Sequence, residues 1–309
     1  MKKPKLLCIV GPTSSGKTSA ALAFAREYNG EIINADARQI YQKTTIGTGK
    51  PVGKWEDRQE VNAYYVENIA HHLMDVLAPE EHSNVVTWHE QAEEIAEAIV
   101  ARRHLPMLVG GTGLYIQAFV EGYVPPTVPP QMEWREKMGQ KTLSELVARL
   151  QEKDPASAAV VDLKNPYRVL RALEVCEYSG RSFVEQRKKH VSSYDILQVG
   201  FSFSREQLYQ RIESAIDGML ERGWVEEVRG LRLQGVPATA PAMTSLGYRE
   251  INSFLDGAHT LIETRAAIIQ STQQYVKRQQ TWFKRDKTIH WFSTKQEMDA
   301  CIRTWFASE

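Results

Sequence analysis

Gly11-Pro12-Thr13-Ser14-Ser15-Gly16-Lys17-Thr18 lies between the apolar run Leu6-Leu7-Cys8-Ile9-Val10 and a run of helix formers at residues 19–25. Strand, glycine-rich loop and helix in this order are the context of the phosphate-binding pattern G-x-x-x-x-G-K-[ST]. The backbone N–H groups of such a loop turn toward phosphate oxygens, and the helix presents the positive end of its dipole to the same place. Lys17 adds a positive charge, and the hydroxyl of Thr18 is placed to hold Mg²⁺. The stretch therefore predicts an α/β fold with a polyphosphate site at Gly11, Pro12, Thr13, Ser14, Ser15, Gly16, Lys17 and Thr18.

The composition is typical of a globular protein with a sizeable core. The 309 residues are 42% hydrophobic and 25% charged, and this length predicts two domains. Lysine and arginine total 38, and aspartate and glutamate also total 38. Because the formal charges balance, any contact with nucleic acid has to come from a local basic patch.

The cysteines Cys8, Cys176 and Cys301 are far apart and form no C-x-x-C pair. This spacing argues against a zinc site and against a disulfide framework, and it favours a reducing compartment. No separate apolar segment of signal-peptide length precedes the first strand, and no apolar run is long enough to span a membrane. We therefore expect a cytoplasmic protein that does not enter membranes.

A second strand is predicted at residues 31–35, and Asp36 follows its carboxyl end. Ligands of parallel α/β sheets bind outside the carboxyl ends of the strands, so Asp36 is expected beside the phosphate loop. There it could act as a general base, as a Mg²⁺ ligand or as a structural cap, and the position favours the first two roles. Lys50, in the glycine-rich stretch that follows, is either a solvated loop residue or part of the site.

Another glycine-rich turn, Gly110-Gly111-Thr112-Gly113, follows a predicted buried strand at residues 105–109. A second strand-to-helix turn in one sheet faces the same cleft, although tight packing alone would also explain the glycines. The adjacent His71 and His72 are interpreted as structural or site-lining residues, because neighbouring side chains of a strand point to opposite faces and do not form a metal site together.

The stretch from Tyr123 to Pro130 contains four prolines in six residues, which neither a helix nor a central strand accommodates. We therefore predict a P-loop NTPase-like α/β core, with a parallel sheet flanked by helices, at residues 1–122 and 195–309. An inserted all-helical domain is expected at residues 123–194, with helices at 132–138, 143–151, 155–161, 166–178 and 183–190. Basic residues are dense in this insertion, and taken alone they indicate a solvated helix face.

The remainder is predicted to be mostly helical after a strand near residues 196–203. Arg211 lies near the middle of a helix over residues 205–222. The end of the helix at residues 260–283 interleaves basic and aromatic residues around Lys277 and Arg278, as a nucleic-acid surface does. A packed helix with a basic outer face is the alternative.

Together these segments resemble the tRNA dimethylallyltransferases, also called tRNA isopentenyltransferases. The resemblance covers nearly the whole chain and rests on motifs in order: residues 11–18, Asp36 with Gln39-Ile40-Tyr41, Ile46-Gly47-Thr48, His71-His72-Leu73, Gly110-Gly111-Thr112-Gly113-Leu114-Tyr115, Asn165-Pro166 with Arg168 and Arg171-Ala172-Leu173-Glu174-Val175, Leu246-Gly247-Tyr248 and Lys277-Arg278-Gln279. Family members usually carry serine at the position of Ala37.

The resemblance implies transfer of a dimethylallyl group from dimethylallyl diphosphate to N6 of the adenosine 3′-adjacent to the anticodon, with release of diphosphate. Lys17, Mg²⁺ and Arg211 would neutralise the leaving group, Asp36 would be the base, and Thr13 would face the site. The acceptor is the anticodon stem-loop of a tRNA, and the enzyme is expected to be a monomer. Residues expected to contact the tRNA are Asp36, Ala37, Arg38, Gln39, Thr112, Arg135, Tyr167, Arg168, Val169, Leu170, Arg171, Lys277 and Arg278.

Three alternatives remain open at this stage. A small-molecule P-loop kinase would use the loop for ATP and Asp36 to activate a hydroxyl. An isopentenyltransferase acting on free adenine nucleotide would share the pocket but have less need of the basic insertion. A P-loop protein without catalytic activity would only bind tRNA or nucleotide, but the presence of Lys17, Thr18, Asp36 and Arg211 argues against it.

Overall fold

The computed structural model describes residues 2–58, 61–124, 126–186, 188–189 and 191–308. The chain divides into two compact units, one formed by residues 1–116 and 193–309 and the other by residues 117–192. The first boundary falls inside helix α3 (Gly113–Val120), several residues before the proline-rich stretch that the sequence indicated.

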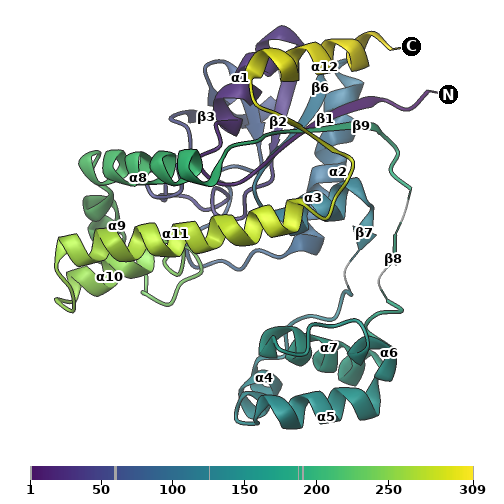
Figure 1. Cartoon of the computed structure of the whole chain (residues 1–309), viewed down its shortest axis with the longest axis vertical. Coiled ribbons are helices and arrows are strands. Elements are labelled where there is room, and N and C mark those ends of the chain that lie inside the picture. The colour runs from purple at the N-terminus through teal and green to yellow at the C-terminus, as the bar shows by residue number, and fades with distance from the viewer. Residues whose placement is uncertain (1, 59–60, 125, 187, 190, 309) are drawn as a thin grey trace. The chain divides into compact units, whose positions relative to one another are not determined.

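An eight-stranded sheet forms the centre of the first unit (Figure 1). Its strands, in the order β10-β9-β1-β6-β2-β5-β4-β3, are β10 (Ile289–Phe292), β9 (Asp195–Phe201), β1 (Lys5–Val10), β6 (Leu105–Gly110), β2 (Gly30–Asn34), β5 (Ile69–His72), β4 (Val61–Val66) and β3 (Lys54–Arg58). All neighbours from β10 to β5 pair in parallel, whereas β4 and β3 are antiparallel. The sheet is therefore mixed rather than parallel throughout.

Continuous apolar runs form the central strands because both faces of the sheet are covered. On one face, Leu7 and Met107 pack in a single apolar cluster with residues of α1 (Lys17–Glu27) and α12 (Lys295–Ala307). The alternate residue Leu108 is also fully buried. Helix α2 (Val85–Ala101) packs against β2 and β6.

Four further helices of this unit build a second apolar cluster: α8 (Arg205–Glu221), α9 (Trp224–Leu233), α10 (Tyr248–Leu255) and α11 (Leu261–Phe283). The long helix α11 packs against α8 and α10 (Figure 1). Since α8 follows β9 and α11 precedes β10, both helices connect directly to strands of the sheet.

The edge strand β3 is mostly polar, with the sequence KWEDR. Glu56 forms ion pairs with Lys54 and Arg58 on the same strand. With a single apolar residue, this strand lacks the apolar alternation that would predict it from sequence. None of the helices in the described part of the chain is long and apolar enough to cross a membrane.

The second unit is mainly helical, with α4 (Met132–Gly139), α5 (Leu143–Lys153), α6 (Pro155–Ala158) and α7 (Pro166–Ser179). Its apolar cluster includes Leu146 and Leu150 of α5 and Leu173 of α7. The predicted helix at residues 183–190 is wrong. Residues 183–186 form turns, and β8 (Lys188–Lys189) pairs antiparallel with β7 (Tyr123–Val124), while residues 187 and 190 lie outside the described residues.

The observed architecture confirms the predicted class, a P-loop-type α/β sheet flanked by helices with an inserted, mainly helical unit. It differs in two details, because β3 and β4 make the sheet mixed and β7 and β8 add a short strand pair to the insertion.

Candidate functional site

The glycine-rich loop between β1 and α1 has an unusual backbone. Gly11, Ser14 and Gly16 have φ angles of 146°, 63° and 85°. The glycines adopt such angles without steric cost, whereas Ser14 carries strain. Gly16 is the N-cap of α1, and no side chain caps the helix there. The first N–H groups of α1 are therefore left for an external acceptor, as in an anion site at a helix N-terminus.

Space inside the loop is small. A Cβ atom at Gly11 would lie 3.1 Å from the Oγ of Ser15. That Oγ is buried and has no hydrogen-bond partner among the residues that the structure describes. A buried polar atom without a partner costs free energy, so an acceptor or donor on a bound ligand would relieve this cost.

Lys17 reaches back over the loop, and its Nζ donates a hydrogen bond of 2.6 Å to the carbonyl of Pro12. Burial lowers the pKa of Lys17 to about 8, and the negative charge of Asp36 partly opposes this shift. A bound anion would favour the charged form and raise the pKa again.

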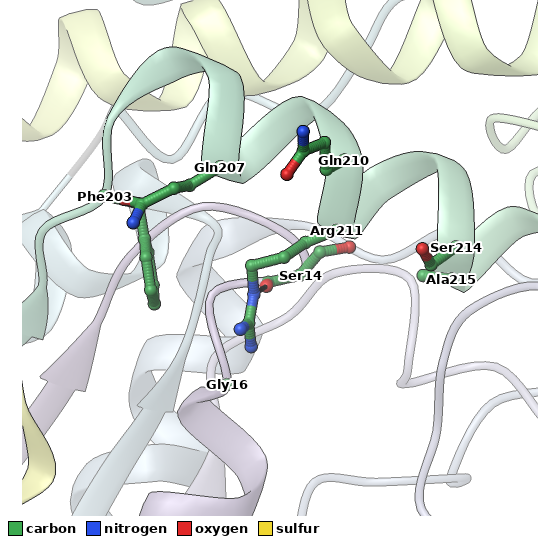
Figure 2. A pocket seen from close by; sticks show the side chains of 8 residues that line it. All are labelled: Ser14, Gly16, Phe203, Gln207, Gln210, Arg211, Ser214 and Ala215. Atoms are coloured by element: carbon green, nitrogen blue, oxygen red, sulfur yellow. Dashed lines mark hydrogen bonds between the residues drawn. The ribbon is translucent and has the colours of Figure 1, made fainter.

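Arg211 of α8 also contacts this loop. Its Nε donates to the carbonyl of Ser14 at 2.8 Å, and its guanidinium lies 4.8 Å from the ring centre of Phe203. Figure 2 shows this side chain pointing from α8 toward the turn at Ser14 and Gly16, with Phe203 beside it. The surrounding cavity has a volume of about 580 Å³ and is also lined by Gln207, Gln210, Ser214 and Ala215.

Asp36 lies two residues after the end of β2, in a loop held by Asn34. The side-chain oxygen of Asn34 accepts from the Asp36 N–H at 3.0 Å, and its amide nitrogen donates to the carbonyls of Asp36 and Leu73 at 3.1 and 2.9 Å. One carboxylate oxygen of Asp36 accepts from the N–H of Arg38 at 2.9 Å. The carboxylate thus has a fixed orientation and keeps a second oxygen for other partners.

The second glycine-rich turn supports this loop. The Thr112 hydroxyl accepts a hydrogen bond of 2.9 Å from the Ala37 N–H, and the Thr112 N–H donates to the carbonyl of Ala35 at 3.1 Å. A Cβ atom at Gly110 would lie 2.1 Å from that carbonyl oxygen, so only glycine permits this approach of the two strand ends. The hydroxyl of Thr112 was predicted to face tRNA, and here it also holds the segment next to Asp36.

Gln279 of α11 is a residue for which sequence reasoning found no role. Its Oε1 accepts from the N–H of Thr13 at 3.0 Å, and its Nε2 donates to the carbonyl of Gly111 at 2.8 Å. The side chain is only 5% exposed. The one available signal was its place in the motif Lys277-Arg278-Gln279, which does not reveal partners 168 and 266 positions away.

These loops surround one cavity of about 680 Å³. The predicted residues that line it are Thr13, Ser14, Ser15, Gly16, Lys17, Thr18, Asp36, Ala37, Arg38, Gln39, Thr112 and Arg278. Gly11 and Pro12 are buried and are not part of this lining, Arg211 lines the cavity of about 580 Å³ instead, and Lys277 is exposed on α11. The lining also includes the apolar residues Ile212, Ala215, Ile216, Met219 and Trp224.

Tyr275 of α11 also lines the cavity. Burial raises the pKa of its hydroxyl, and the negative charge of Asp36 adds to this effect. The hydroxyl therefore stays neutral at physiological pH. The guanidinium of Arg278 lies 5.8 Å from the centre of the same ring.

Lys50 is not a solvated loop residue. Its side chain is fully buried, with Nζ 2.5 Å from the Oδ1 of Asp75 and 2.6 Å from the carbonyl of Tyr41. The nearby loop is fixed by Glu227, whose carboxylate accepts the N–H groups of Thr45, Ile46 and Gly47. This loop contributes Gly47, Thr48 and Gly49 to the cavity.

No group of three His, Cys, Asp or Glu side chains in the described ranges could hold a metal ion. The Nε2 of His72 instead lies 2.6 Å from the buried carboxylate of Glu31. A magnesium ion in this cavity would therefore depend on the Thr18 hydroxyl, water and the oxygens of a bound phosphate.

In the second unit, Arg135 and Arg171 both bind Glu174, whose side chain is fully buried. Arg135 makes two hydrogen bonds to this carboxylate, at 2.8 and 2.7 Å. Arg171 makes one of 2.6 Å and also donates to the carbonyls of Pro126 and Val128. Both guanidinium groups are thus engaged within the unit.

The other residues of α7 that were predicted to contact tRNA differ in how exposed they are. Tyr167 is 66% exposed, and Arg168 is also exposed. Val169 is fully buried, and Leu170 packs against the same apolar cluster. The Val169 side chain faces the core of the unit, and the contact of Val169 with tRNA stays a prediction that its side chain does not support.

Comparisons with known proteins agree with one another. The family model for IPP transferase matches residues 39–286. The tRNA dimethylallyltransferase of Thermomicrobium roseum is 38% identical over 299 residues, which are 96% of this chain and 88% of that protein.

Solved structures give the same result. The full-length tRNA isopentenylpyrophosphate transferase from Bacillus halodurans is 30% identical, with a TM-score of 0.71, and the match covers 99% of this chain and 96% of that one. A eukaryotic dimethylallyltransferase acting on tRNA is 25% identical, with a TM-score of 0.74, over 90% of this chain and 69% of that one. Because the family model and the similar sequences extend over most of its length, the chain belongs to the IPP transferase family.

Proposed function

We propose that this chain transfers a dimethylallyl group from dimethylallyl diphosphate to N6 of the adenosine 3′-adjacent to the anticodon in tRNA, and releases diphosphate. Family membership and the names of the similar proteins support the reaction class. The observation that carries the proposal is the cavity of about 680 Å³, which combines a phosphate loop, a carboxylate and an apolar wall.

The two chemical halves of the donor fit two parts of this cavity. The loop at residues 13–18 suits a diphosphate, because its N–H groups and Lys17 supply hydrogen-bond donors and positive charge. The apolar lining residues Ile216, Met219 and Trp224 suit a five-carbon hydrocarbon chain, which gains free energy when its surface leaves water.

Bond cleavage at an allylic carbon requires that charge on the departing diphosphate be neutralised. Lys17 and Arg211 both supply positive charge at the loop, where they donate to the carbonyls of Pro12 and Ser14. Since the Nε of Arg211 is held by the Ser14 carbonyl, its terminal nitrogens are left for the diphosphate. A bound Mg²⁺ would neutralise further charge on the same oxygens, and Thr18 is the loop residue that would hold it.

The acceptor amine of adenine is a weak nucleophile because its lone pair is delocalised into the ring. Asp36 is the carboxylate of the cavity that can take the amine proton as the new C–N bond forms. Its second oxygen serves this purpose, since the first accepts from the Arg38 N–H. Thr13 faces the same space.

For the tRNA, we propose contacts from Ala37, Arg38, Gln39 and Thr112 at the cavity and from Lys277 and Arg278 on α11. Adenosine has to leave the anticodon-loop stack to reach the cavity, and an exposed basic surface would hold the displaced backbone. In the second unit, Tyr167 and Arg168 are exposed and suited to this task, whereas Arg135 and Arg171 are assigned to the support of α7.

A monomeric enzyme acting in the cytoplasm is the simplest form of this proposal. All candidate residues around the cavity come from a single chain, so the proposed chemistry needs no second copy.

The proposal is tested by incubating the purified chain, Mg²⁺ and unmodified tRNA with radiolabelled dimethylallyl diphosphate and, separately, with labelled ATP. We expect label from the prenyl donor in tRNA and none from ATP. Parallel reactions with free adenosine monophosphate in place of tRNA test for an enzyme of free nucleotides. Phosphate transfer from ATP without prenyl transfer would contradict the proposal.

A further inference from the structure

We infer that Gln279 is a positioning residue, which fixes the loop carrying Thr13 relative to the loop carrying Asp36. The inference rests on the proposed function, since it concerns the reaction assigned to the same cavity. Gln279 lies near the end of α11 and does not line the cavity. It therefore acts through other residues rather than on a substrate.

The hydrogen bonds of Gln279 determine the orientation of its amide without ambiguity. The N–H of Thr13 can only donate, so it faces the oxygen Oε1 at 3.0 Å. The carbonyl of Gly111 can only accept, so it faces the nitrogen Nε2 at 2.8 Å. Because the side chain is 5% exposed, water does not readily replace either bond. One planar amide thus joins the two glycine-rich turns.

Each end of this bridge continues to a residue of the proposed chemistry. At one end, the Thr13 peptide is held at the beginning of the phosphate loop. At the other end, Gly111 precedes Thr112, whose hydroxyl accepts from the N–H of Ala37, the neighbour of Asp36. Three hydrogen bonds thus connect the donor loop at Thr13 with the segment next to Asp36, and Gln279 makes two of them.

The space around the bridge is too small for a different arrangement. A Cβ atom at Gly111 would lie 2.6 Å from the Nε2 of Gln279 and 3.2 Å from the carbonyl oxygen of Gly11. The amide is therefore packed directly against both turns. A displacement of about 1 Å between reacting groups can lower a rate by about a hundredfold.

Two substitutions separate positioning from simple packing. Gln279→Met keeps a long unbranched side chain but removes the hydrogen bonds to Thr13 and Gly111. Gln279→Glu keeps the shape, and its carboxylate can accept from Thr13 but cannot donate to the carbonyl of Gly111. When protonated, the new carboxyl group can do both, so it reproduces the amide. Burial raises the pKa of such a carboxyl group and brings its protonation into the measurable range. The matched control is Gln274→Glu, the same change at an exposed position of α11.

The experiment measures kcat and KM for dimethylallyl diphosphate and tRNA from about pH 5.5 to 8.5, together with the melting temperature. For Gln279→Met we expect kcat to fall by about tenfold to a hundredfold while both KM values change by less than about threefold. For Gln279→Glu we expect a similar loss of kcat at high pH. As the pH falls, the kcat of Gln279→Glu relative to that of the unmodified protein should rise. Gln274→Glu should show no such trend.

Three outcomes would overturn the inference. The first is an unchanged kcat in Gln279→Met, and the second is a kcat ratio of Gln279→Glu to the unmodified protein that does not depend on pH. The third is a fall in kcat that is fully explained by a lower melting temperature of the variants. Failure of the proposed function is distinguishable, because the unmodified protein would then transfer no prenyl group in the same assay.

Discussion

The Nε–H of Arg211 donates a hydrogen bond of 2.8 Å to the backbone carbonyl of Ser14, at the strained position of the phosphate loop. The same guanidinium lies over the ring of Phe203. The Phe203 ring thus packs on one face of the guanidinium, and Ser14 binds its Nε. The terminal nitrogens lie next to the phosphate loop.

We expect Arg211→Lys to lower kcat for prenyl transfer by about a hundredfold, because an ammonium group cannot contact both Ser14 and the departing diphosphate. Steady-state kinetics with dimethylallyl diphosphate and tRNA would measure the effect. Arg205→Lys is the control, since Arg205 is exposed in the first turn of the same helix. Equal kinetics in the two variants would contradict the assigned role.

For Asp36, the informative change is Asp36→Asn. Asparagine keeps an oxygen that accepts from the Arg38 N–H, so the loop retains its shape, but it cannot take the proton of the amine. Turnover should fall by at least about a hundredfold, while tRNA affinity, measured by filter binding, should stay within about threefold of the unmodified protein. Substantial turnover in Asp36→Asn would exclude Asp36 as the base.

Lys17 makes donor binding dependent on pH. Its pKa of about 8 in the free protein is depressed by burial, and a bound diphosphate raises it again. The affinity for dimethylallyl diphosphate should therefore be greatest below pH 8 and fall by up to about tenfold per pH unit above it.

Calorimetry in two buffers of different ionisation enthalpy would detect the proton taken up on donor binding near pH 8. Lys17→Met should bind the donor more weakly and without this proton uptake. Identical proton uptake in Lys17→Met would assign the linkage to another group.

In the second unit, Arg168→Ala and Arg171→Ala should have different effects although both remove a guanidinium from α7. Arg168→Ala should weaken tRNA binding and make its salt dependence shallower, because Arg168 is exposed. Arg171→Ala should lower the stability of the protein by about 1–3 kcal/mol, because it removes a partner of the buried Glu174.

Thermal unfolding and tRNA titrations at several salt concentrations would test this pair. The reverse result, with a stability loss only in Arg168→Ala and a binding loss only in Arg171→Ala, would overturn both assignments.

Local sequence patterns were sufficient to predict the phosphate loop and the central strands. The pattern of residues 11–18 and the apolar runs before it and at residues 105–109 depend on neighbours along the chain. The helix predicted at residues 183–190 failed because a short strand pair, formed with distant Tyr123 and Val124, replaced the local preference.

Partners distant in sequence explain the rest of the differences. Arg171 looks like a cationic surface residue until Glu174 is seen to be buried between it and Arg135. Gln279 has no distinguishing local pattern, and its role depends on two loops that only the folded chain brings together.

The charged strand β3 has a further consequence for the behaviour of the protein in solution. As an edge strand, it carries backbone groups that could pair with a strand of another molecule. Lys54, Glu56 and Arg58 are linked by ion pairs along this strand, and a second strand could approach only by removing water from these charges. The edge therefore discourages aggregation through growth of the sheet.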